Sequence, residues 1–360
     1  MLKAANPMKA LEHQAAQALR LLLEQVPAIK LLDVQQETLS PRHEVDVMAH
    51  IEVFGRPHTL ACEVKSTGQP RHVRTALLQL RNYVAHHEQA VIPVFIAPYL
   101  SPDAQTLCSE QDVGYLDLEG NVRLVFDSVF IERQVESKPV AERRELRSMF
   151  KPKSAQVLRV LLRNASRAWR VTELAQTAGV SLGHVSNVRT GLLDREWAKV
   201  SEDGLFLSEP GILLDAWRDA YEPPPAKRVA FYTTLHGSAF EEAARRVLRA
   251  DGEAGFAVFA SFSAAQWIAP YGRTGTQYFY ADEQGLERLQ SALKLSPISK
   301  GENVVVNALK DSGLFLDAVE PAPGAVCTSP VQTYLDLSGA GERGREAADH
   351  LRQEKLQWPK

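Results

Sequence analysis

Two carboxylates and a lysine stand at spacings that could carry out phosphodiester chemistry. Asp46 lies in the strand-like run Glu44–Met48, and Glu63 and Lys65 lie in a second run that begins at Leu60. Because residues two apart on a strand share a face, Glu63 and Lys65 should point the same way. If the two strands pair, Asp46 joins them, which places two oxygen ligands for a divalent cation beside an ammonium group. Such a cluster could polarise a phosphate and activate a water for hydrolysis.

Helices are expected on either side of these strands. The segment from Val73 to His87 has a helical pattern of apolar residues, and Gln79 and Tyr83, four residues apart on it, should lie on one face. A helix expected from Ala10 to Gln25 offers Glu12 as a further carboxylate.

This arrangement resembles the PD-(D/E)xK nuclease superfamily, and Gln79-x-x-x-Tyr83 resembles the additional helical motif of its RecB-like branch. The resemblance implies a restriction-endonuclease-like α/β domain that binds Mg²⁺. The implied metal ligands are Glu12, Asp46 and Glu63. Lys65 would orient the water or stabilise charge, while Gln79 and Tyr83 would support the site or the phosphate. The proline of the family name is absent, because Val45 precedes Asp46. The same spacing arises by chance in other sequences, and folds of this kind also serve as inert scaffolds, so activity stays open.

Composition sets the broad class of the protein. A length of 360 residues suggests two or three domains, and a hydrophobic content of 45% is ample for ordinary cores. The three cysteines are far apart and fit neither a disulfide framework nor a zinc site, which favours a cytoplasmic protein. No apolar stretch approaches a membrane span, and no signal peptide is visible.

Charge is unevenly distributed along the chain. The formal net charge is −3, but residues 138–170 contain ten Lys or Arg, Lys151 and Lys153 among them, against Glu142 and Glu145, a local balance of 10 − 2 = +8. Such a block is a footprint for phosphate contact or, alternatively, a solvated linker.

Three domains are expected. Residues 1–137 alternate helices with strands, as in an α/β domain around a mixed sheet. Residues 138–221 hold a polar linker, Pro139–Lys153, and a winged helix-turn-helix. A proline spacer at Pro223–Pro225 then leads to a C-terminal α/β domain at residues 222–360.

The middle domain has the spacing of a helix-turn-helix. Ser154 is expected to cap a helix that ends at Arg163, and Thr172 to cap a second helix. The pattern Ala175-x₃-Gly179-x₅-Val185 places a small residue where two helices cross, a glycine at the turn and an apolar anchor on the third helix. Residues 200–207 read as the two strands of a wing. The polar residues expected on or near the DNA-facing side are Arg170, Ser181, His184, Ser186, Asn187 and Arg189. A winged helix used only for protein contact is the alternative.

The last domain carries a second resemblance. Gly237-Ser238 is better read as a helix cap than as a nucleotidyltransferase turn, because no carboxylate pair follows on one strand. A capped helix from Ser329, a glycine-rich break and a final helix from Gly344 resemble AbiEi-type regulators, the antitoxin halves of type IV toxin–antitoxin systems. Ser263-Ala264-Ala265 and the run Tyr115–Asn121 fit a longer member of that family.

The AbiEi resemblance implies a bacterial transcriptional regulator that binds double-stranded operator DNA. It also implies a nucleotidyltransferase toxin as functional counterpart, with or without contact. Two winged helices on a palindrome would make a homodimer, although nothing in the sequence fixes the symmetry. The first hypothesis is therefore a sequence-specific DNA-binding transcriptional regulator that acts on its own promoter, and the second is a metal-dependent DNA endonuclease targeted by the winged helix. In a third reading, the outer domains are modules for dimerisation or toxin sensing.

Overall fold

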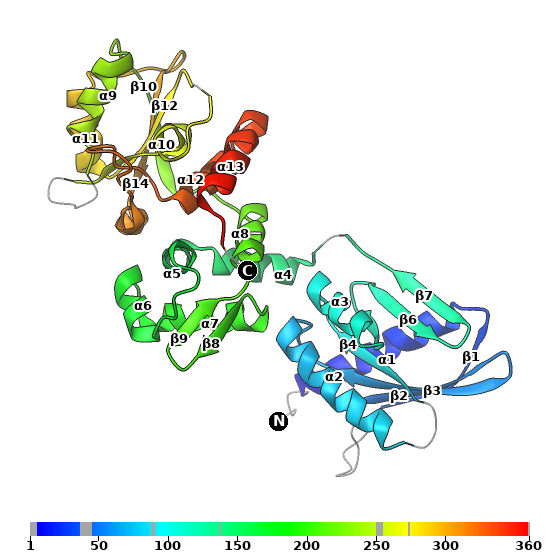
Figure 1. Cartoon of the computed structure of the whole chain (residues 1–360). Coiled ribbons are helices and arrows are strands. Elements are labelled where there is room, and N and C mark those ends of the chain that lie inside the picture. The colour runs from blue at the N-terminus through cyan, green and yellow to red at the C-terminus, as the bar shows by residue number, and fades with distance from the viewer. Residues whose placement is uncertain are drawn as a thin grey trace, which may run out of the picture. The chain divides into compact units, whose positions relative to one another are not determined.

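The computed structural model describes residues 6–36, 45–87, 91–136, 138–249, 255–272 and 274–358. The chain divides into two compact units. The first comprises residues 1–140 with 194–196, and the second comprises residues 141–193 and 197–360. Each unit combines helices with a β-sheet (Figure 1). No helix among the described residues is long and apolar enough to cross a membrane.

Seven strands form one mixed sheet in the first unit, and they lie side by side in chain order. They are β1 (Ile29–Gln36), β2 (Val47–Val53), β3 (Arg56–Val64), β4 (Val91–Ala97), β5 (Gly114–Asp117), β6 (Val122–Phe126) and β7 (Val129–Arg133). Strands β3, β4 and β5 are parallel, whereas all other neighbours pair antiparallel. The predicted α/β domain with a mixed sheet is confirmed.

Helices cover both faces of this sheet. Helix α1 (Pro7–Glu24) packs on one face, and α2 (Pro70–Ala85) and α3 (Pro102–Glu110) pack on the other (Figure 1). The alternation of β3 assigns its residues to the two cores: Cys62 and Val64 belong to the core under α1, and Ala61 to the core under α2 and α3. Glu63 therefore continues the α2 side of the strand.

The edge strands β1 and β7 were not predicted. Only Ile29 of β1 and Val129 of β7 are buried, while most of their other residues face solvent. Both strands contain apolar residues, but the exposed Leu32 and Phe130 and a register shift between Leu31 and Asp33 interrupt the alternation on which a strand prediction depends. The strands that were predicted are the buried, central ones.

The predicted hairpin between β5 and β6 depends on Asp117. This side chain is only 1% exposed. Its Oδ1 accepts from the backbone N–H groups of Glu119, Gly120 and Asn121, at 3.1, 2.9 and 2.8 Å. Its Oδ2 accepts from the backbone N–H of Leu100 at 3.0 Å. The run from Tyr115 to Asn121 thus holds a tight turn, which is a structural role.

The second unit begins with helices and a small hairpin. These elements are α4 (Val140–Met149), α5 (Pro152–Arg163), α6 (Val171–Ala178), α7 (Leu182–Asp194), β8 (Ala198–Ser201), β9 (Gly204–Leu207) and α8 (Pro210–Asp219). Most of the segment Pro139–Lys153, which was expected to be a polar linker, forms α4. The expected caps are wrong: α5 begins at Pro152, two residues before Ser154, and α6 begins at Val171, before Thr172. Proline at the first turn fixes a helical φ, which explains the earlier start of α5.

The rest of the second unit is an α/β structure with a five-stranded sheet. Its elements are β10 (Ala226–Tyr232), α9 (Gly237–Arg245), β11 (Ala257–Phe259), α10 (Ser261–Ile268), β12 (Gln277–Ala281), α11 (Glu283–Ala292), β13 (Ser296–Pro297), β14 (Val304–Leu309), the 3₁₀ helix η1 (Ser312–Asp317), α12 (Pro330–Ser338) and α13 (Gly341–Lys355). The strand order is β11-β12-β14-β10-β13. Ser329 caps α12 as predicted, with its hydroxyl accepting from the Gln332 N–H at 3.3 Å. Ser238 is not the cap of α9, because that position falls to His236.

One apolar core runs through the second unit. Trp169 and Trp217 from its first part belong to the same cluster as Phe279 and Leu351 from its last part. The indole N–H of Trp358 also donates to the Leu162 carbonyl at 3.1 Å. The helices before the proline spacer and the sheet after it are therefore packed together.

Candidate functional site

The end of β3 holds the cluster of charged residues for which phosphodiester chemistry was predicted. Asp46 directly precedes β2, and its N–H donates to the carbonyl of Cys62 at 3.0 Å. Its carboxylate Oδ2 accepts from the backbone N–H of Val64 at 2.7 Å. The two strands pair as expected. Asp46 is hydrogen-bonded to the backbone of Cys62 and Val64, the residues on either side of Glu63.

Glu63 and Lys65 point together, as their spacing predicts. The Lys65 ammonium donates to Glu63 Oε1, and the Lys65 N–H donates to the Ile96 carbonyl at 3.0 Å. Glu63 is only 4% exposed, while Lys65 is partly exposed. At this strand end the buried carboxylate of Glu63 could ligate a cation, and the ammonium of Lys65 beside it could contact a phosphate.

The carboxylates of this cluster act on one another. Burial raises the pKa of Glu63, the hydrogen bond from Lys65 opposes this, and the negative charge of Asp46 raises it further. Burial raises the pKa of Glu12 on α1, and Asp46 again adds to the effect. Asp46 is therefore close enough to Glu12 and to Glu63 to repel each of them, and a cation bound beside Asp46 would relieve that repulsion.

The carboxylates of Asp46 and Glu63 suit a cation that keeps much of its water shell. Among the described residues, no three acidic, histidine or cysteine side chains are grouped closely enough to hold a metal ion. Mg²⁺ is commonly bound through one or two carboxylates with waters completing its shell. Asp46 and Glu63 fit that requirement, with Glu12 nearby.

The two residues of the predicted helix motif, Gln79 and Tyr83, differ in burial. Both residues lie on α2, but Gln79 is exposed whereas Tyr83 is buried. The Tyr83 hydroxyl contacts Met48 Sδ at 3.7 Å, and its ring stacks on His87 with centroids 3.9 Å apart. No hydrogen bond joins Gln79 to the acidic cluster within the described part of the chain. A helical spacing could not show this difference in burial.

A second candidate site begins at the turn between α6 and α7. Gly179 ends α6 with φ 62° and ψ 39°, a left-handed conformation that glycine adopts readily. The N–H of Val180 donates to the Ala175 carbonyl at 3.0 Å. Ala175 and Val185 are buried, as the spacing predicts. After this turn the chain enters α7, whose apolar anchor Val185 lies in the core.

The outer face of α7 is polar. Ser181, His184, Ser186 and Asn187 are exposed, and Arg189 is half-buried. The Ser181 hydroxyl accepts from the N–H of His184 at 3.4 Å, and it lies 2.9 Å from Nδ1 of that ring. This bond holds the imidazole at the start of the helix and leaves Nε2 available. A hollow of about 390 Å³ at this turn is lined in part by Lys153, Gly179 and His184.

The hairpin after α7 adds a cation that the sequence analysis missed. Strands β8 and β9 pair antiparallel, with Ser201 opposite Gly204 at the turn. Lys199 on β8 is exposed and could be recognised in the sequence, because it alternates with Ala198 and Val200 on a short strand. Arg170, at the start of α6, is exposed as well.

Much of the basic block is neutralised within the second unit. Four of its ten cations form ion pairs: Arg147 with Glu222 at 3.3 Å, Lys153 with Asp311 at 2.8 Å, Arg163 with Asp317 at 3.0 Å, and Arg167 with Glu173. Arg159 is buried. The +8 count therefore overstates the charge that this segment presents, since half of its cations already have a structural role.

Comparisons with known proteins do not show the family of this chain. No protein-family model matches it, and no curated protein matches it. Two solved structures resemble part of it. One is EndoMS in apo form, with 16% identity and a TM-score of 0.22 over 29% of this chain and 45% of that one. The other is a repair endonuclease from Pyrococcus abyssi, with 18% identity and a TM-score of 0.21 over 28% of this chain and 46% of that one. The chain thus spans less than half the length of either structure.

Proposed function

We propose that this chain binds duplex DNA through α7 and the β8–β9 hairpin, and that it regulates transcription. The single observation that carries the proposal is the outward polar face of α7. In this proposal α5, α6 and α7 with the hairpin form a winged helix, and α7 enters the major groove.

The side chains on α7 suit contacts with base edges. An asparagine can pair bidentately with adenine and an arginine with guanine, which are the roles assigned to Asn187 and Arg189. The hydroxyls of Ser181 and Ser186, with His184, suit phosphate or base contacts. Exposed cations outside α7, Lys151, Arg170 and Lys199, would contact the backbone of the duplex.

Selection from random duplexes tests the proposal. The chain, without added metal, should enrich a defined sequence that shifts in a mobility assay, and the region upstream of its own gene should contain that sequence. A chain that prefers no duplex over random DNA at moderate salt would refute sequence-specific regulation.

The AbiEi resemblance supports finer points of this proposal. It favours an autoregulating cytoplasmic antitoxin with a nucleotidyltransferase toxin as counterpart. A palindromic selected sequence would support a homodimer, because two copies then bind equivalent half-sites. Toxicity of a neighbouring nucleotidyltransferase that this chain does not relieve would exclude the antitoxin role.

A second candidate function is metal-dependent DNA cleavage of the PD-(D/E)xK type. The observation that favours it is the junction of β2 and β3, where Asp46 is bonded to the backbone beside the Glu63–Lys65 pair. A bound Mg²⁺ would supply Lewis-acid stabilisation of a phosphate. Asp46 and Glu63 would hold the ion, and the Lys65 ammonium would orient the water. Plasmid incubated with Mg²⁺ or Mn²⁺ should be cut by the wild type and left intact by Glu63→Ala.

A further inference from the structure

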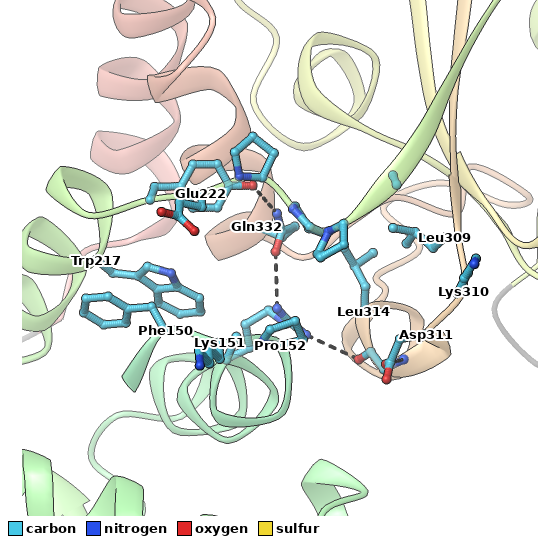
Figure 2. Close-up of a pocket in the computed structure, with 18 of the residues that line it drawn as sticks. Phe150, Lys151, Pro152, Trp217, Glu222, Leu309, Lys310, Asp311, Leu314 and Gln332 are labelled. Atoms are coloured by element: carbon cyan, nitrogen blue, oxygen red, sulfur yellow. Dashed lines mark hydrogen bonds between the residues drawn. The ribbon is translucent and has the colours of Figure 1, made fainter. Parts of the chain in front are cut away.

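A cavity of about 660 Å³ lies within the second unit (Figure 2). Segments far apart in the sequence line it: α4 and α5, the end of α8, the proline spacer, β14, η1 and α12. Small-molecule sites are concave, mostly apolar and provided with a few polar groups that fix orientation. This cavity has the size of such a site.

One wall of the cavity is aromatic. The rings of Phe150 and Trp217 stack with centroids 5.5 Å apart and planes inclined by 4°. Figure 2 shows this pair on one side of the cavity and Leu309, Lys310 and Leu314 on the other. A flat or apolar ligand body could lie between these walls.

The cavity is also lined by a buried arginine with unused hydrogen-bonding capacity. Arg159, on α5, is only 4% exposed. Its Nη1 donates to Gln332 Oε1 at 3.2 Å and its Nη2 to the Gly313 carbonyl at 3.3 Å, both neutral acceptors (Figure 2). Its Nε has no hydrogen-bond partner within the described part of the chain. Asp317, Asp336 and Asp311 act on this guanidinium through space, but no carboxylate among the described residues is hydrogen-bonded to it, so its Nε can still donate to a bound anion.

The acids that line the cavity are already engaged. Glu222 pairs with Arg147 at 3.3 Å, and Asp311 pairs with Lys153 at 2.8 Å. Lys151, Lys227 and Lys310 also line the cavity and are exposed. The lining therefore carries more positive than negative charge, which attracts an anion.

We infer that this cavity binds a small organic anion. Its carboxylate or phosphate group meets Arg159 with help from the lysines, and its aromatic or apolar body packs against Phe150 and Trp217. The inference concerns the second unit alone and does not rest on the proposed binding of DNA.

Calorimetric titration of the whole chain tests the inference with four probes: phenyl phosphate, benzoate, phenol and inorganic phosphate. Phenyl phosphate, benzoate or both should bind saturably at millimolar concentration or below, and which of them binds identifies the anionic group. Phenol and inorganic phosphate, each lacking half of the recognised chemistry, should bind at least about tenfold more weakly.

Two variants locate the binding. Arg159→Met should weaken binding of the aromatic anion by about tenfold or more, because it removes a charge-assisted contact while keeping volume. Lys310→Ala, at an exposed position, should weaken it by about threefold without threatening the fold. Lys300→Ala, an exposed lysine outside the cavity, should change nothing. Absence of saturable binding, equal binding of phenol, or binding that Lys310→Ala leaves unchanged would each overturn the inference.

Discussion

Asp336 on α12 is a carboxylate enclosed by hydrogen-bond donors. Its Oδ1 accepts from the Tyr280 hydroxyl at 3.1 Å, from Gln332 Nε2 at 3.0 Å and from the Tyr221 hydroxyl. Its Oδ2 is buried and has no partner within the described residues. Burial raises the pKa of Asp336 to about 6, while these donors oppose the shift. The carboxyl of Asp336 therefore holds its proton more tightly in the folded second unit than in the unfolded chain.

The first prediction concerns Asp336→Asn. A carboxyl whose pKa is higher in the folded state stabilises the fold fully below its unfolded value of 3.8, and this contribution is lost as pH rises through about 6. The asparagine keeps an acceptor at Oδ1 and carries no charge. At pH 7.5 the variant should be more stable than the wild type by up to about 3 kcal/mol, and the difference should vanish near pH 4.

Urea unfolding monitored by tryptophan fluorescence measures this effect, because all five tryptophans belong to the second unit. The exposed substitution Asp349→Asn on α13 is the matched control and should leave the pH profile unchanged. A variant that is less stable at pH 7.5 than at pH 4, relative to wild type, would show that the ionised carboxylate is favoured instead.

The second prediction concerns Lys65 and belongs to the cleavage hypothesis. Lys65→Met should reduce Mg²⁺-dependent plasmid cleavage by at least about a hundredfold, because it removes a charge aimed at the phosphate. Lys30→Met, on the edge strand β1, serves as control. Cleavage that persists in Lys65→Met would place the activity outside this cluster.

Local spacing in the sequence was enough to predict which residues form the acidic cluster, but it did not predict what surrounds them. Alternation along a strand brings Glu63 and Lys65 together whatever the rest of the fold, and pairing of neighbouring strands adds Asp46. The exposure of Gln79 and the cavity around Arg159 depend on contacts between distant segments. Arg159 meets Gln332, 173 positions away, and no local pattern contains that information.

At the scale of elements, two glycines near the start of α7 should respond oppositely to alanine. Gly179 has a positive φ, and a Cβ there would lie 2.9 Å from Leu316 Cδ1. Gly183 is helical and a Cβ there would meet nothing closer than Ser181 Oγ at 3.8 Å. Gly179→Ala should destabilise the second unit by about 1–2 kcal/mol, and Gly183→Ala should stabilise it by about 0.5–1 kcal/mol.

Chemical unfolding followed by tryptophan fluorescence compares these two variants. Equal effects of the two substitutions would mean that the α6–α7 turn does not require a left-handed residue. Gly183→Ala also adds only a methyl group to the outer face of α7, so any large loss of DNA affinity in this variant would locate the duplex close to that residue.

The sequence predicted elements well where one face is buried and poorly where it is not. Helices α5, α6 and α7 carry apolar residues at helical spacing, and β3, β4 and β6 carry apolar or alternating runs. Helix α4 has only Leu146 and Met149 buried, so its charged sequence looked like a linker. Strands β1 and β7 were missed because exposed apolar residues interrupt their alternation.

At the scale of the whole molecule, charge limits how the chain can bind DNA. The net charge is −3, and four cations of the basic block are used in ion pairs. In the proposed complex, four exposed or half-buried cations, Lys151, Arg170, Arg189 and Lys199, contact phosphates or bases. Each neutralised phosphate contributes about −0.9 to the salt dependence of binding.

The logarithm of the binding constant should therefore fall with the logarithm of salt concentration with a slope of about −3 to −4 per chain. Fluorescence anisotropy of a labelled duplex at several salt concentrations gives this slope. A slope of about −7 would mean that the four paired cations also leave their carboxylates to bind DNA.

The shared core of the second unit could not be foreseen either. The proline spacer at Pro223–Pro225 suggested a boundary, because such segments often separate domains. Residues on both sides of it instead contribute to one apolar cluster. Composition reveals where the local sequence becomes rich in proline, but it contains no information on whether the residues before and after that point pack together.

Substitution on the outer face of α7 tests the central claim most directly. With the selected duplex as target, anisotropy titration of the whole chain should show Asn187→Ala and Arg189→Ala each weakening binding by about 1–3 kcal/mol, or roughly 5- to 150-fold. The exposed control Arg246→Ala on the C-terminal part should bind like the wild type. If Asn187→Ala and Arg189→Ala both bind the selected duplex as tightly as that control, α7 does not read DNA and the account is contradicted.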